Sequence, residues 1–137
     1  MDVNILAVLT GTVVMFAVGA FWYGIPFQKA WGRIHGFDKL SKKEQDALMK
    51  DMGMTYGIQL VVTVISAYVL AHFLTLVPHL EFYKLAFFLW VGFVMPSQVS
   101  AVLFSRTEKK YKFEQIAIMS AEALVRLMLA AWVISLY

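Results

Sequence analysis

Four long apolar intervals constrain this chain more than any other feature of its sequence. They cover residues 4–24, 53–77, 84–105 and 115–136, and together they hold only three charged side chains, Lys84, Glu122 and Arg126. Each interval reaches the roughly 20 residues that a helix needs to cross about 30 Å of hydrocarbon. Backbone polar groups in lipid must be satisfied within the protein, and no segment alternates like a membrane β-strand. We therefore predict an all-α fold, a four-helix transmembrane bundle with up-down topology.

Composition supports a single integral membrane domain over residues 1–137. Apolar residues make up 61% of the chain and charged residues 15%, whereas soluble domains are closer to half and a quarter. These values disfavour a water-soluble globule and exclude a disordered chain, and the absence of cysteine excludes a disulfide scaffold. No dense basic run indicates a nucleic-acid partner. We expect the first span to be retained, because only Asp2 and the terminal amine precede it and its apolar run exceeds a signal core.

The basic residues predict how the spans are oriented. Loops 25–52 and 106–114 hold ten lysines and arginines, whereas the loop on the opposite side holds only Lys84. Short cytoplasmic loops carry this excess, so we expect both basic loops in the cytoplasm and both termini outside, in a bacterial cytoplasmic membrane. Attraction of these lysines to anionic lipid is an alternative, which the four acidic neighbours in the first loop weaken.

The first basic loop contains a predicted short amphipathic helix. Ser41 and Glu44 have the spacing of a capping box, and Leu48, Met49 and Met52 then fall on one face. We expect this helix to lie on the membrane surface, although it would also suit a partner protein.

An acid and a base inside the fourth span are the unusual feature of the chain. Glu122 and Arg126 are four residues apart, which places them on one helix face. Each charge alone costs roughly 2.5–3.5 kcal/mol near the centre of a span, so the pair is expected to face the bundle interior.

Further polar residues lie in the second and third spans. Gln59, Thr63 and Ser66 share a helix face. Gln59 and Gln98 are expected in the same third of the bilayer as Glu122, and Ser66 nearer the midplane with Arg126. We predict a buried network of these residues with Glu122 and Arg126. Two interpretations stay open: such a network holds helices together, or it marks a pathway for a proton, an ion or a ligand.

Three residues are predicted to shape helix packing, and three to anchor the chain at the interface. Gly11 and Gly19 lie on a small-residue stripe of the first span, which suits close contact within the chain or with another subunit. Pro96 predicts a bend in the third span, either an ordinary one or a hinge. The predicted anchors, chosen because aromatic rings favour the membrane interface, are Trp22, Tyr23 and Trp31.

Catalytic and metal motifs are not found in the sequence. His72, His79 and Glu81 cluster near one span end, but spread-out histidines without cysteine are typical of packing roles. No nucleophile–base pair or cofactor motif occurs, so we expect no catalytic residues, metal or cofactor.

The segment from Phe16 to Trp31, FAVGAFWYGIPFQKAW, resembles the opening of a family of small bacterial four-helix membrane proteins known as a domain of unknown function. The stretch from Leu89 to Phe93 is similar to that family's Trp-Gly-Phe segment. The resemblance implies four-helix architecture and no particular activity. The family often carries Asn and His early in the fourth span, where this chain has Met119 and Ala123.

Two hypotheses for the function follow. The first is a non-enzymatic, self-associating membrane protein, surrounded by lipids, whose buried polar network binds a partner or a small ligand. The second is a small proton- or cation-linked transporter or channel that uses Glu122 as the titratable group and Arg126 as its counter-ion.

Overall fold

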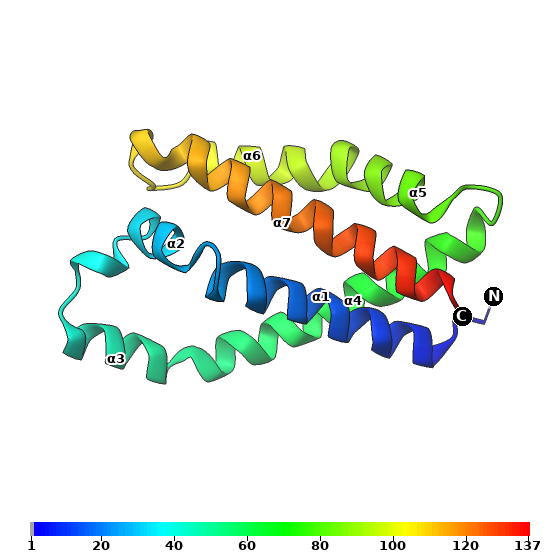
Figure 1. Ribbon diagram of the computed structural model, residues 1–137, viewed down its shortest axis with the longest axis horizontal. Coiled ribbons are helices and arrows are strands. Elements are labelled where there is room, and N and C mark those ends of the chain that lie inside the picture. Colours follow the sequence, from blue (N-terminus) through cyan, green and yellow to red (C-terminus); the bar gives the residue numbers. More distant parts are fainter. Residues whose placement is uncertain (1) are drawn as a thin grey trace.

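The computed structural model describes residues 2–137, which contain helices and turns and no strand. Four helical stretches are long and apolar enough to cross a membrane: α1 (Ile5–Gly24), α4 (Met52–Leu76), Phe82–Leu103, and α7 (Lys109–Ser135). They run alternately up and down, and both marked ends of the chain lie at the same end of the bundle (Figure 1). The predicted all-α fold with four candidate membrane-spanning helices is confirmed.

The helices begin and end where local chemistry favours it. Asn4 caps α1, because its side-chain oxygen accepts hydrogen bonds from the amides of Leu6 and Ala7 at 2.9 and 3.4 Å. Helix α7 begins at Lys109, before the apolar interval does, so its first turn lies in the basic segment.

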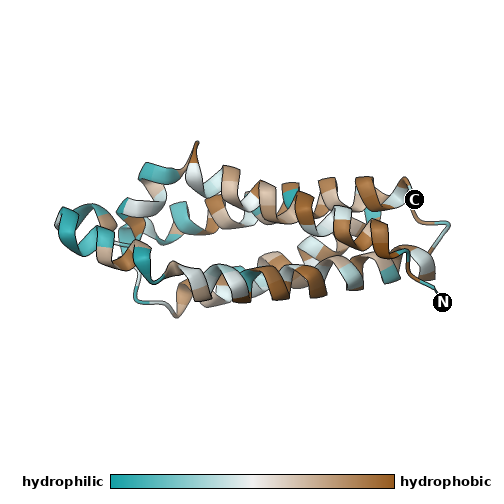
Figure 2. Cartoon of the chain, turned by 90° about the horizontal axis from the view of Figure 1, so that it is seen from below, coloured by the Kyte–Doolittle hydropathy of each residue, from teal (hydrophilic) through white to brown (hydrophobic). Residues whose placement is uncertain are grey.

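Hydrophilic residues gather at one end of the molecule, and hydrophobic residues dominate the long helices between the ends (Figure 2).

The segment between α1 and α4 is more helical than the sequence predicted. The predicted amphipathic helix is present as α3 (Lys42–Lys50), and Ser41 Oγ accepts a hydrogen bond from the Glu44 amide at 3.2 Å. Two further elements, α2 (Gln28–Ile34) and the 3-10 helix η1 (Phe37–Lys39), precede it and were not predicted. They are joined at Gly36, whose φ of 72° is a conformation that side chains other than glycine rarely adopt.

Helix α7 is the central element of the bundle. It packs against α1 on one side and against α5 (Phe82–Leu89) and α6 (Met95–Leu103) on the other, while α4 packs mainly against α1. The core lies toward the end that carries the termini. Small residues fill much of it and let the helices approach closely, among them Ala7, Ala67, Ala71, Ala86, Ala130 and Ala131.

Gly11 lies at a close contact between α1, α7 and α4. A Cβ atom added to it would lie 2.7 Å from Cδ1 of Ile134 on α7 and 3.6 Å from Cβ of Ala67 on α4. The sequence does not distinguish a contact within the chain from a contact with another subunit. The structure shows that Gly11 makes its contact within the chain.

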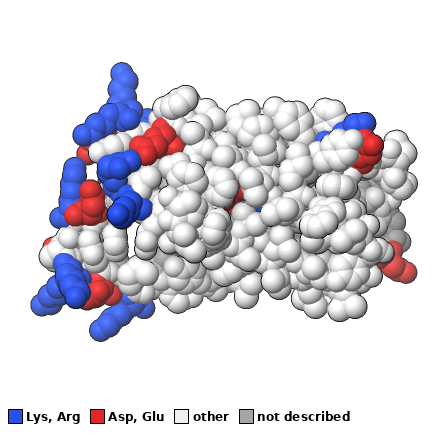
Figure 3. Space-filling model, in the orientation of Figure 1, with Lys and Arg blue, Asp and Glu red and all other residues white. Residues whose placement is uncertain are grey.

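The two basic loops meet at the end opposite the termini. Arg33 Nη2 lies 2.7 Å from Glu114 Oε1, and Lys39 Nζ lies 3.3 Å from Glu108 Oε1. The hydrogen bond from Lys39 lowers the pKa of Glu108. Lysine and arginine side chains gather at this end of the molecule (Figure 3).

The third span contains a π-helical turn where the sequence predicted a proline bend. The π segment η2 (Trp90–Val94) lies between α5 and α6, and the Met95 amide bonds back to the carbonyl of Trp90. Because Pro96 has no amide hydrogen, the regular ladder of hydrogen bonds cannot pass through it. The wider turn lies directly before the proline, as is common where a helix accommodates such a break.

The contact at Gly11 generates a packing prediction. Gly11→Val is expected to lower the free energy of unfolding in detergent by about 1–3 kcal/mol, because the new methyl groups overlap Ile134. Gly24→Val is the matched control, since no atom lies within 4 Å of the Cβ position there. Adding Ile134→Ala to Gly11→Val is expected to cost less than the sum of the two single changes. Full additivity would contradict the contact.

Candidate functional site

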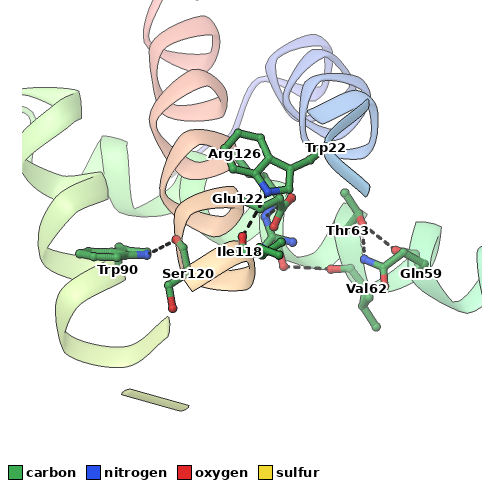
Figure 4. A network of polar contacts seen from close by, with 10 residues as sticks. Trp22, Gln59, Val62, Thr63, Trp90, Ile118, Ser120, Glu122 and Arg126 are labelled. Atoms are coloured by element: carbon green, nitrogen blue, oxygen red, sulfur yellow. Dashed lines mark hydrogen bonds and ion pairs between the residues drawn. The ribbon is translucent and has the colours of Figure 1, made fainter. Parts of the chain in front are cut away.

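Glu122 and Arg126 lie at the middle of α7. Glu122 is thirteen positions from each end of the helix, which corresponds to about 20 Å in either direction. The residue is 3% exposed, whereas the Arg126 side chain is 28% exposed. Arg126 Nε lies 3.7 Å from Glu122 Oε1, so the two side chains form the predicted ion pair (Figure 4).

The carboxylate of Glu122 has unused hydrogen-bonding capacity. A charge-assisted hydrogen bond between N–H and a carboxylate oxygen spans about 2.7–2.9 Å, so the 3.7 Å contact with Arg126 is a loose one. Within residues 2–137, no side chain or amide donates a hydrogen bond to either oxygen of Glu122. A carboxylate accepts up to about four such bonds, and no residue of the described chain supplies one here.

Helix α1 covers Glu122 closely. A Cβ atom added to Gly19 would lie 3.5 Å from Glu122 Oε1, so the glycine brings the α1 backbone next to the carboxylate. One turn earlier on α7, the carbonyl oxygen of Ile118 accepts a hydrogen bond from Trp22 Nε1 at 3.1 Å. This part of α1 therefore both shields the carboxylate and is tied to the turn that carries it.

A second tryptophan holds the same turn of α7 from another helix. Trp90, at the start of the π segment, donates from Nε1 to the carbonyl oxygen of Ser120 at 2.8 Å. Trp22 and Trp90 lie on different sides of α7 (Figure 4). Their two bonds reach carbonyl groups just before Glu122 and fix the rotation of α7 that turns Glu122 inward.

The sequence predicted neither of these bonds. The sequence predicts an interface position for Trp22 and no site role for Trp90. An indole N–H within an apolar segment requires an acceptor, and this requirement is the signal that could have suggested a buried bond.

The other predicted members of the polar network do not join the ion pair. Gln59 Nε2 donates to Thr63 Oγ1 at 3.3 Å, and Thr63 Oγ1 donates to the carbonyl of Gln59 at 2.6 Å. Ser66 Oγ donates to the carbonyl of Val62 at 3.0 Å. All of these bonds stay within α4, because serine and threonine in a helix readily bond to the carbonyl four residues earlier.

Three buried polar atoms have no hydrogen-bond partner in the described part of the chain. They are Gln98 Oε1 on α6, Ser120 Oγ on α7 and His72 Nδ1 on α4. Gln98, a predicted member of the network, is therefore unconnected to it. Gln115, on the same face of α7 as Glu122, bonds instead to the loop through Thr107 Oγ1 at 2.7 Å.

Two of the three predicted aromatic anchors, Tyr23 and Trp31, form a cluster with His35 where α1 turns into α2. The rings of Tyr23 and Trp31 are 4.5 Å apart between centroids, and the His35 ring meets Trp31 edge-on at the same distance. Burial lowers the pKa of His35. No group of three or more His, Cys, Asp or Glu side chains that would suit a metal ion occurs among residues 2–137.

Comparison with known proteins identifies a family. The model of the family described as "Protein of unknown function (DUF1761)" matches residues 6–135. The chain belongs to this family, in agreement with the resemblance of its first and third spans. Neither the curated proteins nor the solved structures contain a match to this chain.

The ion pair generates a stability prediction. Arg126→Leu leaves the buried carboxylate of Glu122 without a counter-charge and is expected to lower the free energy of unfolding by about 3 kcal/mol. Glu122→Gln is expected to cost less, because the stranded Arg126 is partly accessible. The double variant is expected to be more stable than Arg126→Leu alone. Unfolding in detergent micelles, followed by circular dichroism, measures all three.

A surface ion pair provides the control. Arg33→Leu removes the 2.7 Å pair with Glu114, whose side chains are both more exposed than that of Glu122. Solvent screening limits its expected cost to about 1 kcal/mol or less, although the distance is shorter. A double variant at residues 122 and 126 that is no more stable than either single variant would contradict the pairing.

Proposed function

We propose that this member of the DUF1761 family is a small membrane protein that binds a ligand through a cationic or hydrogen-bond-donating group at Glu122. The observation that carries the proposal is the environment of the Glu122 carboxylate. It is 3% exposed, it lies midway along a membrane-length helix, and its one charged contact in the described chain is a loose ion pair at 3.7 Å.

The Glu122 carboxylate receives no hydrogen bond from the described chain, although it can accept about four. Removing a charged group from water is costly unless hydrogen bonds replace its hydration, and an intramembrane ionisable residue commonly marks a functional site. A ligand that offers an ammonium, amidinium or hydroxyl group supplies the missing donors. The rest of such a ligand must be apolar, because long apolar helices surround the carboxylate.

A panel of alkyl probes tests the ligand class. Octylammonium is expected to bind and to change the tryptophan fluorescence, because Trp22 is bonded one turn from Glu122. Octanoate, with the same apolar chain and the opposite charge, is expected to bind at least ten-fold more weakly. Glu122→Gln is expected to remove this preference, whereas Glu44→Gln, on the exposed helix α3, leaves it unchanged. Equal binding of both probes, or a preference retained in Glu122→Gln, would overturn the proposal.

Proton- or cation-linked transport is the second candidate function. The observation that favours it is that Glu122 lies midway between the two ends of α7 while the Arg126 side chain, one turn further on, stays 28% exposed. Charged atoms are also visible in a small opening midway along an otherwise uncharged surface (Figure 3). Proton flux into proteoliposomes, followed with an entrapped pH dye, separates the candidates. Binding without flux supports a binding protein, and flux that Glu122→Gln abolishes supports a transporter.

We also propose that loops 25–52 and 106–114 face the cytoplasm of a bacterial cell and that both termini face outward. Ten basic residues in these loops support this orientation, and so does their common position at one end of the bundle. Residues 53–62 of α4 are all exposed in the single chain, which supports the self-association expected for so thin a bundle.

Cysteine labelling tests the orientation, because the natural chain has no cysteine. Lys43→Cys and Lys110→Cys are expected to react with a membrane-impermeant maleimide only after the cytoplasmic face is opened. His79→Cys, in the turn between α4 and α5, is expected to react in intact cells. The reverse pattern would contradict the orientation and leave the fold unaffected.

A further inference from the structure

An open apolar groove of about 440 Å³ lies between α4 and the third span. Ile65, Val69 and Phe73 of α4 form one wall, and Leu89 and Phe93 form the other, with Leu127 of α7 between them. Helix α4 packs mainly against α1, and the third span packs against α7, so the two walls of the groove are held apart. Its volume falls within the range of about 300–1,000 Å³ that is typical of small-molecule sites.

The chemistry of the groove requires an apolar occupant. Eight of its nine lining residues are apolar, and the ninth is Ser66. The Ser66 hydroxyl already donates to the carbonyl of Val62 at 3.0 Å, so it needs no partner from an occupant. Neither Glu122 nor Arg126 lines the groove, which separates it from the proposed ligand site.

The length and depth of the groove match one leaflet of a bilayer. Along α4 it extends from Ile65, at the middle of the helix, to Phe73, three residues before the helix ends at Leu76. These eight steps correspond to about 12 Å. Half of a hydrocarbon core of about 30 Å is about 15 Å, which is the depth that one acyl chain occupies. The leaflet concerned is the one on the side of the termini (Figure 1).

The π-helical turn shapes the inner end of the groove. Phe93 and Val94 belong to η2, and both line the groove at the end that lies nearest the middle of the third span. The groove is thus bounded by the π-helical irregularity of the third span.

We propose that this groove is a specific binding site for one acyl chain of a phospholipid from the leaflet on the side of the termini. The apolar lining, the length of one leaflet and the position between two separated walls all fit this occupant. The lipid there is bound to the protein and is distinct from the mobile lipid that surrounds the other helix faces.

Two matched substitutions on α4 test the proposal. Val69→Phe fills the groove, whereas Val62→Phe adds the same volume outside it, and both valines are 44% exposed. The probe is phosphatidylcholine, spin-labelled near the end of one chain, in phosphatidylcholine bilayers that contain the full-length protein. Electron paramagnetic resonance then measures the number of motionally restricted chains per protein.

Val69→Phe is expected to lose one restricted chain per protein, and Val62→Phe is expected to retain it. Native mass spectrometry of the purified protein is expected to show one retained phospholipid that only Val69→Phe loses. Equal numbers of restricted chains in the two variants would overturn the proposal. So would conversion of a dimer to a monomer by Val69→Phe, because a second copy would then be the occupant. Circular dichroism of both variants verifies that the helices remain folded.

Discussion

The need to shelter a charged carboxylate at the centre of a membrane-length helix governs the arrangement of this bundle. Glu122 is 3% exposed, and its placement requires α7 to be covered on the face that carries it. Helix α1 supplies that cover through Gly19, whose lack of a side chain brings the backbone next to the carboxylate. The rotation of α7 is fixed by two indole donors, Trp22 of α1 on one side and Trp90 of η2 on another.

Glu122 is buried, Arg126 is partly exposed, and the contact between them is loose; the proposed ligand site rests on this combination. A pair whose only task is to stabilise the bundle would be expected to form short hydrogen bonds, since unsatisfied charge is costly in lipid. The Glu122–Arg126 contact is 3.7 Å, and Arg126 is still partly exposed. The proposed ligand at Glu122 accounts for both features, because it supplies the donors that the helices do not.

Much of the fold could be predicted from the sequence, because membrane insertion constrains the chain so strongly. The lengths of the apolar intervals determine the number of spans, and Ser41 and Glu44 mark the start of α3. The spacing of Glu122 and Arg126 determines that they share a face. Periodicity cannot supply the distance between helices, so it predicts a common face for Gln59, Thr63 and Ser66 without revealing that they bond within α4. The π turn and the two indole bonds depend on contacts between segments far apart in the chain, and no local pattern specifies them.

The most direct test of this account measures what surrounds Glu122 in a bilayer. Solid-state NMR of protein labelled at the Glu122 carboxyl, the Arg126 guanidinium and the Gly19 Cα reports which groups lie near the carboxylate. The account predicts contacts from the Glu122 carboxyl to both the Arg126 guanidinium and the Gly19 backbone, with none to lipid acyl protons. Contacts to acyl chains together with none to Gly19 would contradict it.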